Sequence, residues 1–554
     1  MTHYGELTNT VRTPQTEQAR PNQVQNHAGG YVFEVGPWKQ LDRFLILGQV
    51  GPTYYATERE VVKENADVIR RCVEEDGVRV VRRIVEISDA GRAPKNDPAI
   101  FALAIAAGAD KPETRQAALA ALPKVCRIGT HLFHFASDIG GFRRWGRSLR
   151  TAIARWYTER DEDALAMQAL KYQQRDGWSH RDLLRLAHPR PKTPRMEATF
   201  RWMTGGTDAL AKEGRRSKPI PKEHLHGLLA AFDEVRAAKT VDDVARLVAK
   251  HELPREAIPT EWLNHREVWD ALLPHMGVTA MIRNLGKMTA VGLLTPMSEA
   301  SAHVVATLSN ESVIRKGRVH PMQFLLAQGI YRRGQGEKGK LSWSPVREVG
   351  DALDAGFYAA FANVEPTGLR TLIALDVSGS MDSGTIAGAP GVTPRVASAA
   401  LAMVTARTEK HWHMVGFTAS PGGYGGRFGG GNPGLTPIDV SRAERLDALC
   451  AKVRKMPMGG TDCALPMLYA AGNDLEVDVF IVLTDNETWH GDVHPFQALK
   501  AYRAKSGRNA KLIVVGMEAN EFTIADPSDA GMLDVCGFDS HAPAIMSSFA
   551  RGEF

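Results

Sequence analysis

Hydrophobic residues are spaced differently in the two parts of this chain, and the change comes near Pro366. From about residue 60 to residue 360, apolar residues recur at three- and four-residue steps, as in 97–108, 113–127 and 278–288. This spacing predicts helices with one buried face, separated by turns rich in Pro, Gly and Asp. A long all-helical array without a strict repeat period favours an α-solenoid of the HEAT type.

After Pro366, short apolar runs rich in β-branched residues alternate with helical segments. The runs predict strands at 370–376, 413–418, 478–485 and 511–517, and the segments between them predict helices at 394–408, 441–455 and 496–505. Buried parallel strands that alternate with helices are typical of a doubly wound, Rossmann-like α/β domain. The chain is therefore expected to be multidomain, and ligands of the second part are expected at the carboxyl ends of its strands.

The composition is that of a globular protein without a membrane segment. The chain has 554 residues, too many for one core, with 44% hydrophobic and 24% charged residues. Residues 1–29 are polar and lack the apolar stretch of a secretory signal, so we expect a disordered tail. The five cysteines form no C-x-x-C pair, which favours free thiols in a reducing cytoplasm.

Positive charge is concentrated in one stretch of the helical part. Between Arg143 and Arg195 there are thirteen Lys and Arg against six Asp and Glu, an excess of seven, whereas the net charge of the whole chain is +5. This concentration is typical of a face that binds a polyanion. The alternative is a solvated helix surface in a basic protein, and charge alone does not decide between the two.

Polar side chains follow the predicted strands of the second part at three places. Asp376 and Asp485 each end an apolar strand, Ser378 and Ser380 follow on the first loop, and Thr461 lies in a Gly-Gly-Thr-Asp loop. Oxygen ligands of which few are charged suit Mg²⁺, with Mn²⁺ as the alternative ion. The D-x-S-x-S pattern in this order resembles the metal-ion-dependent adhesion site of von Willebrand A domains, and it leaves the ion able to bind an acidic group of a partner.

Other interpretations of the same residues are weaker. Ser378 and Ser380 could cap a following helix. Asp376 could accept a phosphoryl group, but a serine rather than a second acid lies two residues on, and no general base is evident. Cys463 could act as a thiol nucleophile, although a buried thiol at a helix start is the better interpretation. The sequence therefore predicts a binding protein rather than an enzyme.

Several stretches in both parts of the chain carry a resemblance to one known family. They include GGYVFEV (29–35), VCRIGTHLF (125–133), KYQQRDGWSHRDLLRLAH (171–188), RNLGKMT (283–289) and FIVLTDNETW (480–489). On these stretches the two parts together resemble the Ro ribonucleoprotein autoantigen family (SS-A/Ro), in which a TROVE module precedes a von Willebrand A domain, and its bacterial members in particular. The resemblance implies a tail at 1–29, a HEAT-like helical ring at 30–365 and a metal-binding A domain at 366–554.

The resemblance also implies a function that composition and spacing do not show. Y RNA-like small noncoding RNAs would bind the outer face of the ring, and single-stranded 3′ ends of misfolded RNAs would enter its central cavity. The protein would act as a monomer in noncoding RNA quality control, maturation or decay, in some cases with a 3′ exoribonuclease. A metal-dependent scaffold for an acidic protein partner is the alternative from another class.

Candidate RNA contacts fall into two groups. The family's Y RNA contacts match Lys171, Arg175 and His188, and the basic surface continues through His180, Arg181 and Arg185. Lys171 and Arg175 would share one face of a helix. Plausible cavity contacts are Arg127, Thr130, His131 and Lys287.

Each of these assignments has a structural alternative. His180 could be a neighbour of a helix cap, Arg185 could pair with Asp182, and Trp178 is better explained as a core residue than as a stacking platform. The glycine-rich segment 421–434, with Tyr424, Arg427 and Phe428, resembles an RNA-contacting RGG-type segment, but a flexible insertion without a partner is the favoured interpretation.

Overall fold

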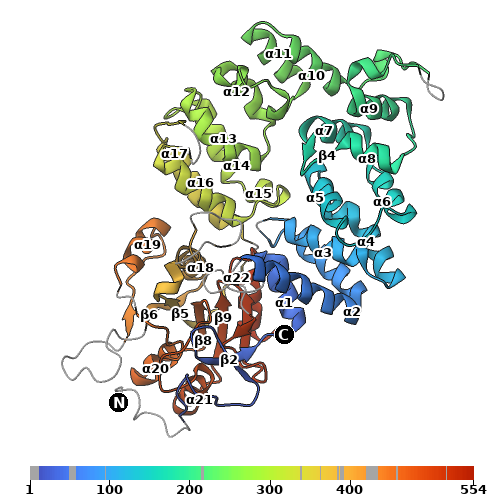
Figure 1. Cartoon of the computed structure of the whole chain (residues 1–554). Coiled ribbons are helices and arrows are strands. Elements are labelled where there is room, and N and C mark those ends of the chain that lie inside the picture. Colours follow the sequence, from blue (N-terminus) through green and yellow to red (C-terminus); the bar gives the residue numbers. More distant parts are fainter. Residues whose placement is uncertain are drawn as a thin grey trace.

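The structure, a computed structural model, has a helical part and an α/β part (Figure 1). It describes residues 12–48, 58–93, 95–213, 218–336, 340–361, 364–382, 386, 392–418, 434–456, 459–518 and 521–553. The first eleven residues of the predicted tail and nearly all of the glycine-rich segment 421–434 lie outside these ranges. The division near Pro366 agrees with the change in hydrophobic pattern.

The first part is helical, as the three- and four-residue spacing predicts. Its helices are α1 (Pro37–Leu47), α2 (Glu58–Ala90), α3 (Asp97–Gly108), α4 (Pro112–Val125), α5 (Gly129–Ile139), α6 (Arg147–Thr158), α7 (Glu162–Lys171), α8 (His180–Ala187), α9 (Pro194–Gly205), α10 (Gly227–Ala237), α11 (Val241–His251), α12 (Arg266–Leu272), α13 (Val278–Ala290), α14 (Glu299–Leu308), α15 (Glu311–Lys316), α16 (Pro321–Arg333) and α17 (Arg347–Ala359). Side-chain caps start several of them: Asp161 accepts a hydrogen bond from Ala164 N, and Thr240 from Asp243 N.

These helices follow a closed ring (Figure 1). In the first half, α3, α5 and α7 lie on the inner side and α4, α6 and α8 on the outer side. The two halves meet where Arg318 Nη2 donates to Asp89 Oδ1 at 2.6 Å and the His320 ring nitrogen Nε2 lies 3.1 Å from the Arg92 carbonyl. The expectation of a ring is confirmed, and the ring is closed.

The second part is a doubly wound α/β domain, as predicted. Its six-stranded sheet has the order β11-β9-β8-β5-β6-β7, in which only β7 is antiparallel to its neighbour. The strands are β5 (Arg370–Asp376), β6 (His411–Phe417), β7 (Leu435–Pro437), β8 (Val479–Thr484), β9 (Lys511–Gly516) and β11 (Met532–Cys536). The helices are α18 (Pro394–Thr408), α19 (Leu446–Arg454), α20 (Leu465–Gly472), α21 (Pro495–Ser506) and α22 (Ala542–Arg551).

The prediction of a disordered tail is wrong for residues 12–29. We call residues 12–35 the N-terminal strap; Figure 1 shows its dark blue trace lying across the α/β domain. Strands β1 (Gln23–Gln25) and β2 (Tyr31–Glu34) pair with each other, and β2 pairs with β10 (Phe522–Thr523). The polar composition that suggests disorder supplies side-chain amides, such as that of Gln15, which is fully buried.

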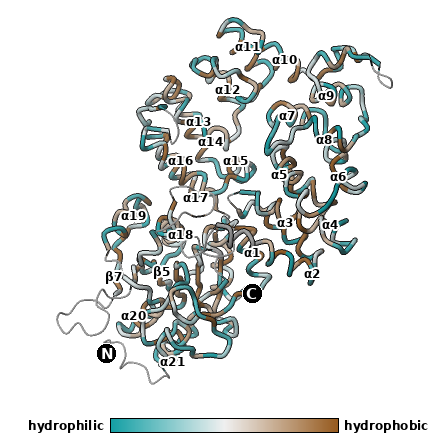
Figure 2. The backbone as a smooth tube through the Cα atoms, viewed as in Figure 1, coloured by the Kyte–Doolittle hydropathy of each residue, from teal (hydrophilic) through white to brown (hydrophobic). Residues whose placement is uncertain are grey.

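The ring and the α/β domain share a packed interface. One continuous set of buried hydrophobic residues runs from the second half of the ring into one face of the sheet. A buried ion pair joins the first half of the ring to the α/β domain, with Arg43 Nη2 2.8 Å from Asp534 Oδ2. Figure 2 shows α3 as a largely hydrophobic segment between its flanking helices. The α/β domain and both halves of the ring therefore form one packed assembly.

Two further expectations concern cysteines and membranes. Cys72, Cys126, Cys450 and Cys463 are buried free thiols, which confirms the prediction for these four. No helix in the described ranges is long and apolar enough to cross a membrane.

Candidate metal centre and nucleic-acid interface

The predicted metal ligands gather at the carboxyl edge of the sheet. Asp376 ends β5, and its carboxylate accepts hydrogen bonds from Ser378 N at 2.9 Å and from Thr484 Oγ1 at 2.7 Å. The hydroxyls of Ser378 and Ser380 lie 3.1 Å apart on the same loop. Because parallel strands β5 and β8 are neighbours, Asp485, which follows β8, comes to the same edge.

Burial makes the two carboxylates costly without a cation. Asp376 is 1% exposed and Asp485 is 2% exposed. Burial raises the pKa of Asp376, against which hydrogen bonds from Ser378 and Thr484 act. Burial also raises the pKa of Asp485, and the neighbouring charge of Asp376 raises it further. Two buried carboxylates that repel each other, surrounded by hydroxyls, are a donor set that fits Mg²⁺ or Mn²⁺.

Thr461 lies on the third loop, which hydrogen bonds hold against the loop after Asp485. The side chain of Thr461 is buried, and its carbonyl accepts hydrogen bonds from Trp489 N at 3.2 Å and from His490 N at 3.0 Å. Thr418 Oγ1 also donates to the Gly460 carbonyl at 3.0 Å. Within the described ranges no group of three or more His, Cys, Asp or Glu side chains could hold a metal ion. A metal ion at this edge would therefore depend on two carboxylates and several hydroxyls.

Two residues that were not predicted from the sequence hold the loop of Ser378 and Ser380 in place. Thr484 directly precedes Asp485 and orients Asp376, and its position in the strand-final Thr-Asp pair could have indicated it. Arg395, at the start of α18, is 2% exposed, and its Nη2 donates to the carbonyls of Val377 at 3.3 Å and Ser378 at 3.1 Å. Its Nε also donates to Asp382 Oδ1 at 2.7 Å, and no sequence motif links Arg395 to these partners.

The N-terminal strap contacts the two other loops of the candidate metal site, the loop of Thr461 and the loop after Asp485. Gln15 Nε2 donates to Asp462 Oδ1 at 2.7 Å and to the Val493 carbonyl at 2.8 Å, and Thr488 Oγ1 donates to Gln15 Oε1. Asn26 Nδ2 donates to the Thr488 carbonyl at 2.8 Å. The strap therefore fixes the loop after Thr461 relative to the loop after Asp485.

The thiol interpretation of Cys463 finds no support in the structure. Its sulfur is fully buried beside Thr484 Oγ1, at 3.6 Å. Burial raises the pKa of Cys463 well above its ordinary value, and a nucleophilic cysteine needs the opposite shift.

In the helical part, the predicted basic face is present but differs in detail. Helix α7 ends at Lys171, and Arg175 lies in β3 (Gln174–Arg175), paired with β4 (Trp178–Ser179). The prediction that Lys171 and Arg175 share one helix face is therefore wrong. The hairpin turn between the strands requires left-handed backbone, with φ of 50° at Asp176 and 77° at Gly177.

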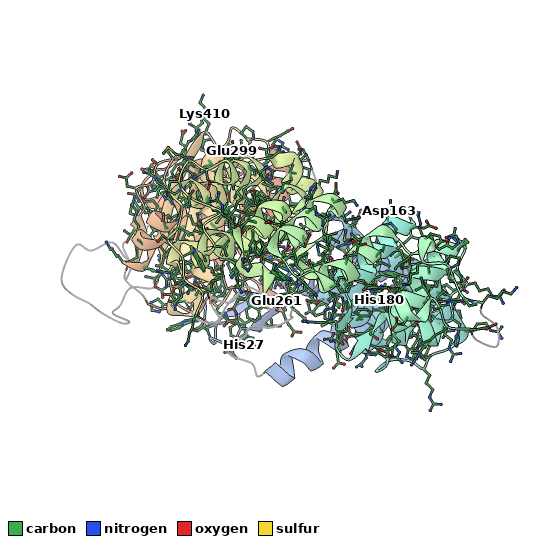
Figure 3. All side chains as sticks on the ribbon, turned by 90° about the horizontal axis from the view of Figure 1, so that it is seen from above. His27, Asp163, His180, Glu261, Glu299 and Lys410 are labelled. Carbon is green, nitrogen blue, oxygen red and sulfur yellow. The ribbon has the colours of Figure 1, made fainter. Side chains whose placement is uncertain are left out.

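His180 does not belong to this face. It is 3% exposed, its Nδ1 lies 2.9 Å from the Tyr157 hydroxyl, and its Nε2 lies 3.2 Å from the Gln168 carbonyl. Figure 3 shows it among the helices of the first half of the ring. The prediction of an RNA contact at His180 is wrong, because the residue follows the helix cap Ser179, whose capping box with Asp182 turns the imidazole inward.

The remaining residues of the basic face are exposed. Arg181 and Arg185 lie on α8, and His188 follows it in left-handed conformation, with φ of 47°. The alternative pairing of Arg185 with Asp182 is not formed, because the Asp182 carboxylate accepts from Ser179 N at 3.0 Å. Trp178 is half-buried, with its ring centroid 5.5 Å from that of Trp145.

Three of the four cavity candidates lie near the start of α5, a helix of the inner row. Arg127 is half-buried and its Nη1 donates to Ser88 Oγ at 3.0 Å and to the Lys124 carbonyl at 3.0 Å. Thr130 and His131 are half-buried. Burial, followed by the nearby charge of Arg127, lowers the pKa of His131 to about 4. His131 is therefore neutral at pH 7 and cannot offer a charge to phosphate.

Lys287 lies on α13, in the second half of the ring. It lines a cavity of about 590 Å³ together with Arg283, Trp343 and, from the first half of the ring, Lys95. Its Nζ donates to Asn264 Oδ1 at 2.8 Å. Lys95 adjoins Asn96, whose Nδ2 lies 3.4 Å from His131 Nδ1, so the cavity that Lys287 lines reaches the neighbourhood of the other three candidates.

The burial of His180 predicts a pH-dependent contribution to stability. Burial lowers its pKa to about 4 from the ordinary value of 6.5. The unfolded chain then binds a proton below pH 6.5 that the folded protein excludes, so this contribution is present above pH 6.5 and is lost as the pH falls towards 4. The destabilisation caused by His180→Asn at pH 7.5 should shrink by about 2 kcal/mol at pH 5, at about 1.4 kcal/mol per pH unit. Urea unfolding of both proteins at the two pH values measures this, and a constant difference would contradict it.

Comparisons with known proteins cover both parts of the chain. Residues 24–330 match the TROVE domain family and residues 370–550 match the Ro60 vWA domain family. The chain is 41% identical over 547 residues to the RNA-binding protein RO60 of Deinococcus radiodurans, which covers 98% of each protein. It is 36% identical to the RNA-binding protein RO60 of Caenorhabditis elegans over 99% of this chain and 93% of that one. The crystal structure of the Deinococcus radiodurans RO (RSR) protein superposes with a TM-score of 0.67 at 39% identity, covering 94% of this chain and all of that one.

Proposed function

Because the chain belongs to the Ro60 family, we propose that it is a non-enzymatic RNA-binding protein of the Ro type. Its outer basic face binds Y RNA-like small noncoding RNAs, and its central cavity receives single-stranded 3′ ends of misfolded RNAs. The similarity over 98% of the chain to a protein named for RNA binding is the observation that carries the proposal. In this role the protein serves noncoding RNA quality control, maturation or decay.

The outer face supports this proposal through its charge. Arg181, Arg185 and His188 are exposed, and no carboxylate in the described ranges pairs with them. The two arginines have no acidic partner and are free to meet phosphates, because no existing ion pair has to be broken on binding. We further propose that the protein works as a monomer, in a reducing cytoplasm that its free thiols favour.

We propose a different role for the α/β domain, namely metal-dependent capture of a protein partner such as a 3′ exoribonuclease. A bound Mg²⁺ or Mn²⁺ would supply a coordination position for an acidic side chain of that partner. Asp376, Asp485, Ser378, Ser380 and Thr461 would hold the ion. Trp489, on the loop after Asp485, is 39% exposed, and offers an apolar contact next to the metal loops. This capture is also the core of the alternative function, a scaffold in which RNA is incidental.

The basic face gives a test of the RNA proposal. The double variant Lys171→Ala, Arg175→Ala should bind a small structured RNA more weakly. A plot of its log affinity against log salt concentration should also be less steep, by about 1 for each phosphate that the protein no longer neutralises. The control Lys410→Ala, Lys500→Ala removes the same charge from exposed positions on the α/β domain and should leave the slope unchanged. Fluorescence anisotropy with labelled RNA at several salt concentrations measures both. Equal slopes for the two variants would contradict the proposal.

Purification of the protein from its source tests the same proposal against the scaffold alternative. Co-purifying material with a high ratio of absorbance at 260 to 280 nm, removed by ribonuclease, is the expected result. Protein that carries no nucleic acid would favour the scaffold.

A further inference from the structure

The β3–β4 hairpin, which carries Arg175, is held to the ring at its tip. The hairpin packs against α5 (Figure 1), and Nδ1 of His134 on that helix is hydrogen-bonded to Asp176 Oδ2 in the turn. Because an ionised carboxylate can only accept a hydrogen bond, the imidazole is the donor. On its other side, His134 Nε2 lies 3.6 Å from Oδ1 of Asp97, the first residue of α3. His134 therefore lies between two carboxylates.

The same aspartate also faces the arginine of the hairpin. Arg175 Nε lies 3.6 Å from Asp176 Oδ1, and Asp176 is the only acidic side chain within 4 Å of Arg175 among the residues that the structure describes. This distance is longer than that of a hydrogen bond. The two oxygens of one carboxylate are thus divided between His134 and Arg175, and His134 has the closer contact.

The partners of Asp176 differ in their exposure to water. The His134 side chain is 21% exposed, whereas that of Arg175 is 61% exposed. A partly buried hydrogen bond to a charged group is stronger than an exposed ion pair at longer range. The carboxylate is therefore held on the side of α5, and the guanidinium of Arg175 is left to the solvent.

The turn itself does not require a carboxylate at this position. Asp176 and Gly177 form a two-residue turn with positive φ at both residues, and Asn-Gly suits such a turn as well as Asp-Gly does. The charge of Asp176 therefore acts through its side-chain contacts and not through the backbone, so the two roles can be separated by experiment.

We propose that His134 is a positioning residue for RNA binding, which holds the Asp176 carboxylate away from Arg175 and leaves the guanidinium available to a phosphate. The inference rests on the proposed RNA function, in which Arg175 belongs to the basic face. The N–H of the imidazole also partly offsets the negative charge of Asp176, which would otherwise repel the RNA backbone. Without His134, the carboxylate would turn to Arg175 and compete with the RNA for it.

The experiment is a suppressor test with a small structured RNA, measured by fluorescence anisotropy at several salt concentrations. His134→Ala should weaken binding about fivefold, the upper end of the usual contribution of one exposed charge pair. Its plot of log affinity against log salt concentration should be less steep by about 1, because one phosphate is no longer neutralised. Adding Asp176→Asn to His134→Ala should restore both values, since the competing charge is gone and the turn is kept.

Two further variants complete the set. Asp176→Asn alone should bind the RNA at least as tightly as the unaltered protein, because a charge that repels phosphate is removed. The matched control is His226→Ala, which removes a histidine of similar exposure that lies 2.7 Å from Asp163 elsewhere in the ring. This control should leave both the affinity and the salt dependence unchanged.

A purely structural role of His134 would give a different pattern. Unchanged binding by His134→Ala, or weakened binding that Asp176→Asn does not restore, would overturn the inference while the RNA function stands. If His134→Ala did not fold, Asp176→Asn alone would decide, because weaker binding by this variant would show that the carboxylate assists Arg175. Failure of the unaltered protein to bind the RNA would instead remove the RNA function itself.

Discussion

Replacing Asp376 with asparagine should abolish binding of Mg²⁺ and Mn²⁺ while the fold remains. The carboxylate lies at the centre of the candidate site, where it accepts hydrogen bonds from Ser378 N and Thr484 Oγ1. Asparagine keeps the shape of the side chain and removes its charge. Loss of a residue that only hydrogen-bonds to a metal ligand usually lowers the affinity for the metal about 10–100-fold. Loss of a ligand itself should therefore lower it more.

Isothermal titration with Mg²⁺ and electron paramagnetic resonance with Mn²⁺ measure this effect. Asp439→Asn, at an exposed position beyond β7, is the matched control and should bind metal as the unaltered protein does. RNA affinity should be the same for all three proteins, because the basic face lies on the ring. An Asp376→Asn protein that binds Mn²⁺ normally would show that these residues do not form a metal site.

The second large effect concerns the N-terminal strap. A Cβ atom on Gly30 would lie 1.9 Å from the Thr488 carbonyl oxygen and 2.8 Å from Trp489 Cα. Both are backbone atoms of the loop after Asp485 and cannot move independently. Gly30→Ala should therefore lower the free energy of unfolding by about 3 kcal/mol, at the upper end of the usual cost of overpacking, and should release the strap. Release of the strap should also weaken the affinity for Mg²⁺, because the strap holds the loop of Thr461 against the loop after Asp485.

Urea unfolding and hydrogen exchange of residues 12–35 measure the two parts of this prediction. The control is Gly329→Ala on α16, where a Cβ atom would meet nothing within 4 Å. Because alanine is favoured over glycine inside a helix, this control should raise stability by about 0.5–1 kcal/mol. Normal stability and slow exchange of the strap in Gly30→Ala would contradict the close contact.

The parts that could be predicted from the sequence are those in which neighbours in the chain are also neighbours in space. Asp376, Ser378 and Ser380 share one loop, and parallel strands bring Asp485 to the same edge whatever the details of packing. Helix α18 has the predicted bounds, because Thr393 and Pro394 mark its start plainly. The periodic pattern of hydrophobic residues also suffices to predict the helices of the ring, but it does not predict that the ring is closed.

The rest depends on distant contacts or on single backbone angles. The spacing of Lys171 and Arg175 suits a helix, but Gly177 turns that segment into a hairpin. His180 stands in a basic run, yet its ring points to Tyr157, a residue that the local sequence does not bring near. No local sequence pattern predicts the roles of Gln15 and Gly30, because their partners lie more than 400 residues away in the chain.

The strap has a consequence for how the protein is made. Gln15 leaves the ribosome well before its partner Asp462, which follows 447 residues later. At about 5–20 residues per second, translation leaves the strap without its binding site for roughly 20–90 s. A hydrophobic segment exposed for that time would invite aggregation, whereas this polar one stays hydrated until the α/β domain arrives. The domain that is translated later thus captures a segment that is translated earlier, and the strap can dock only after the whole helical part has been made.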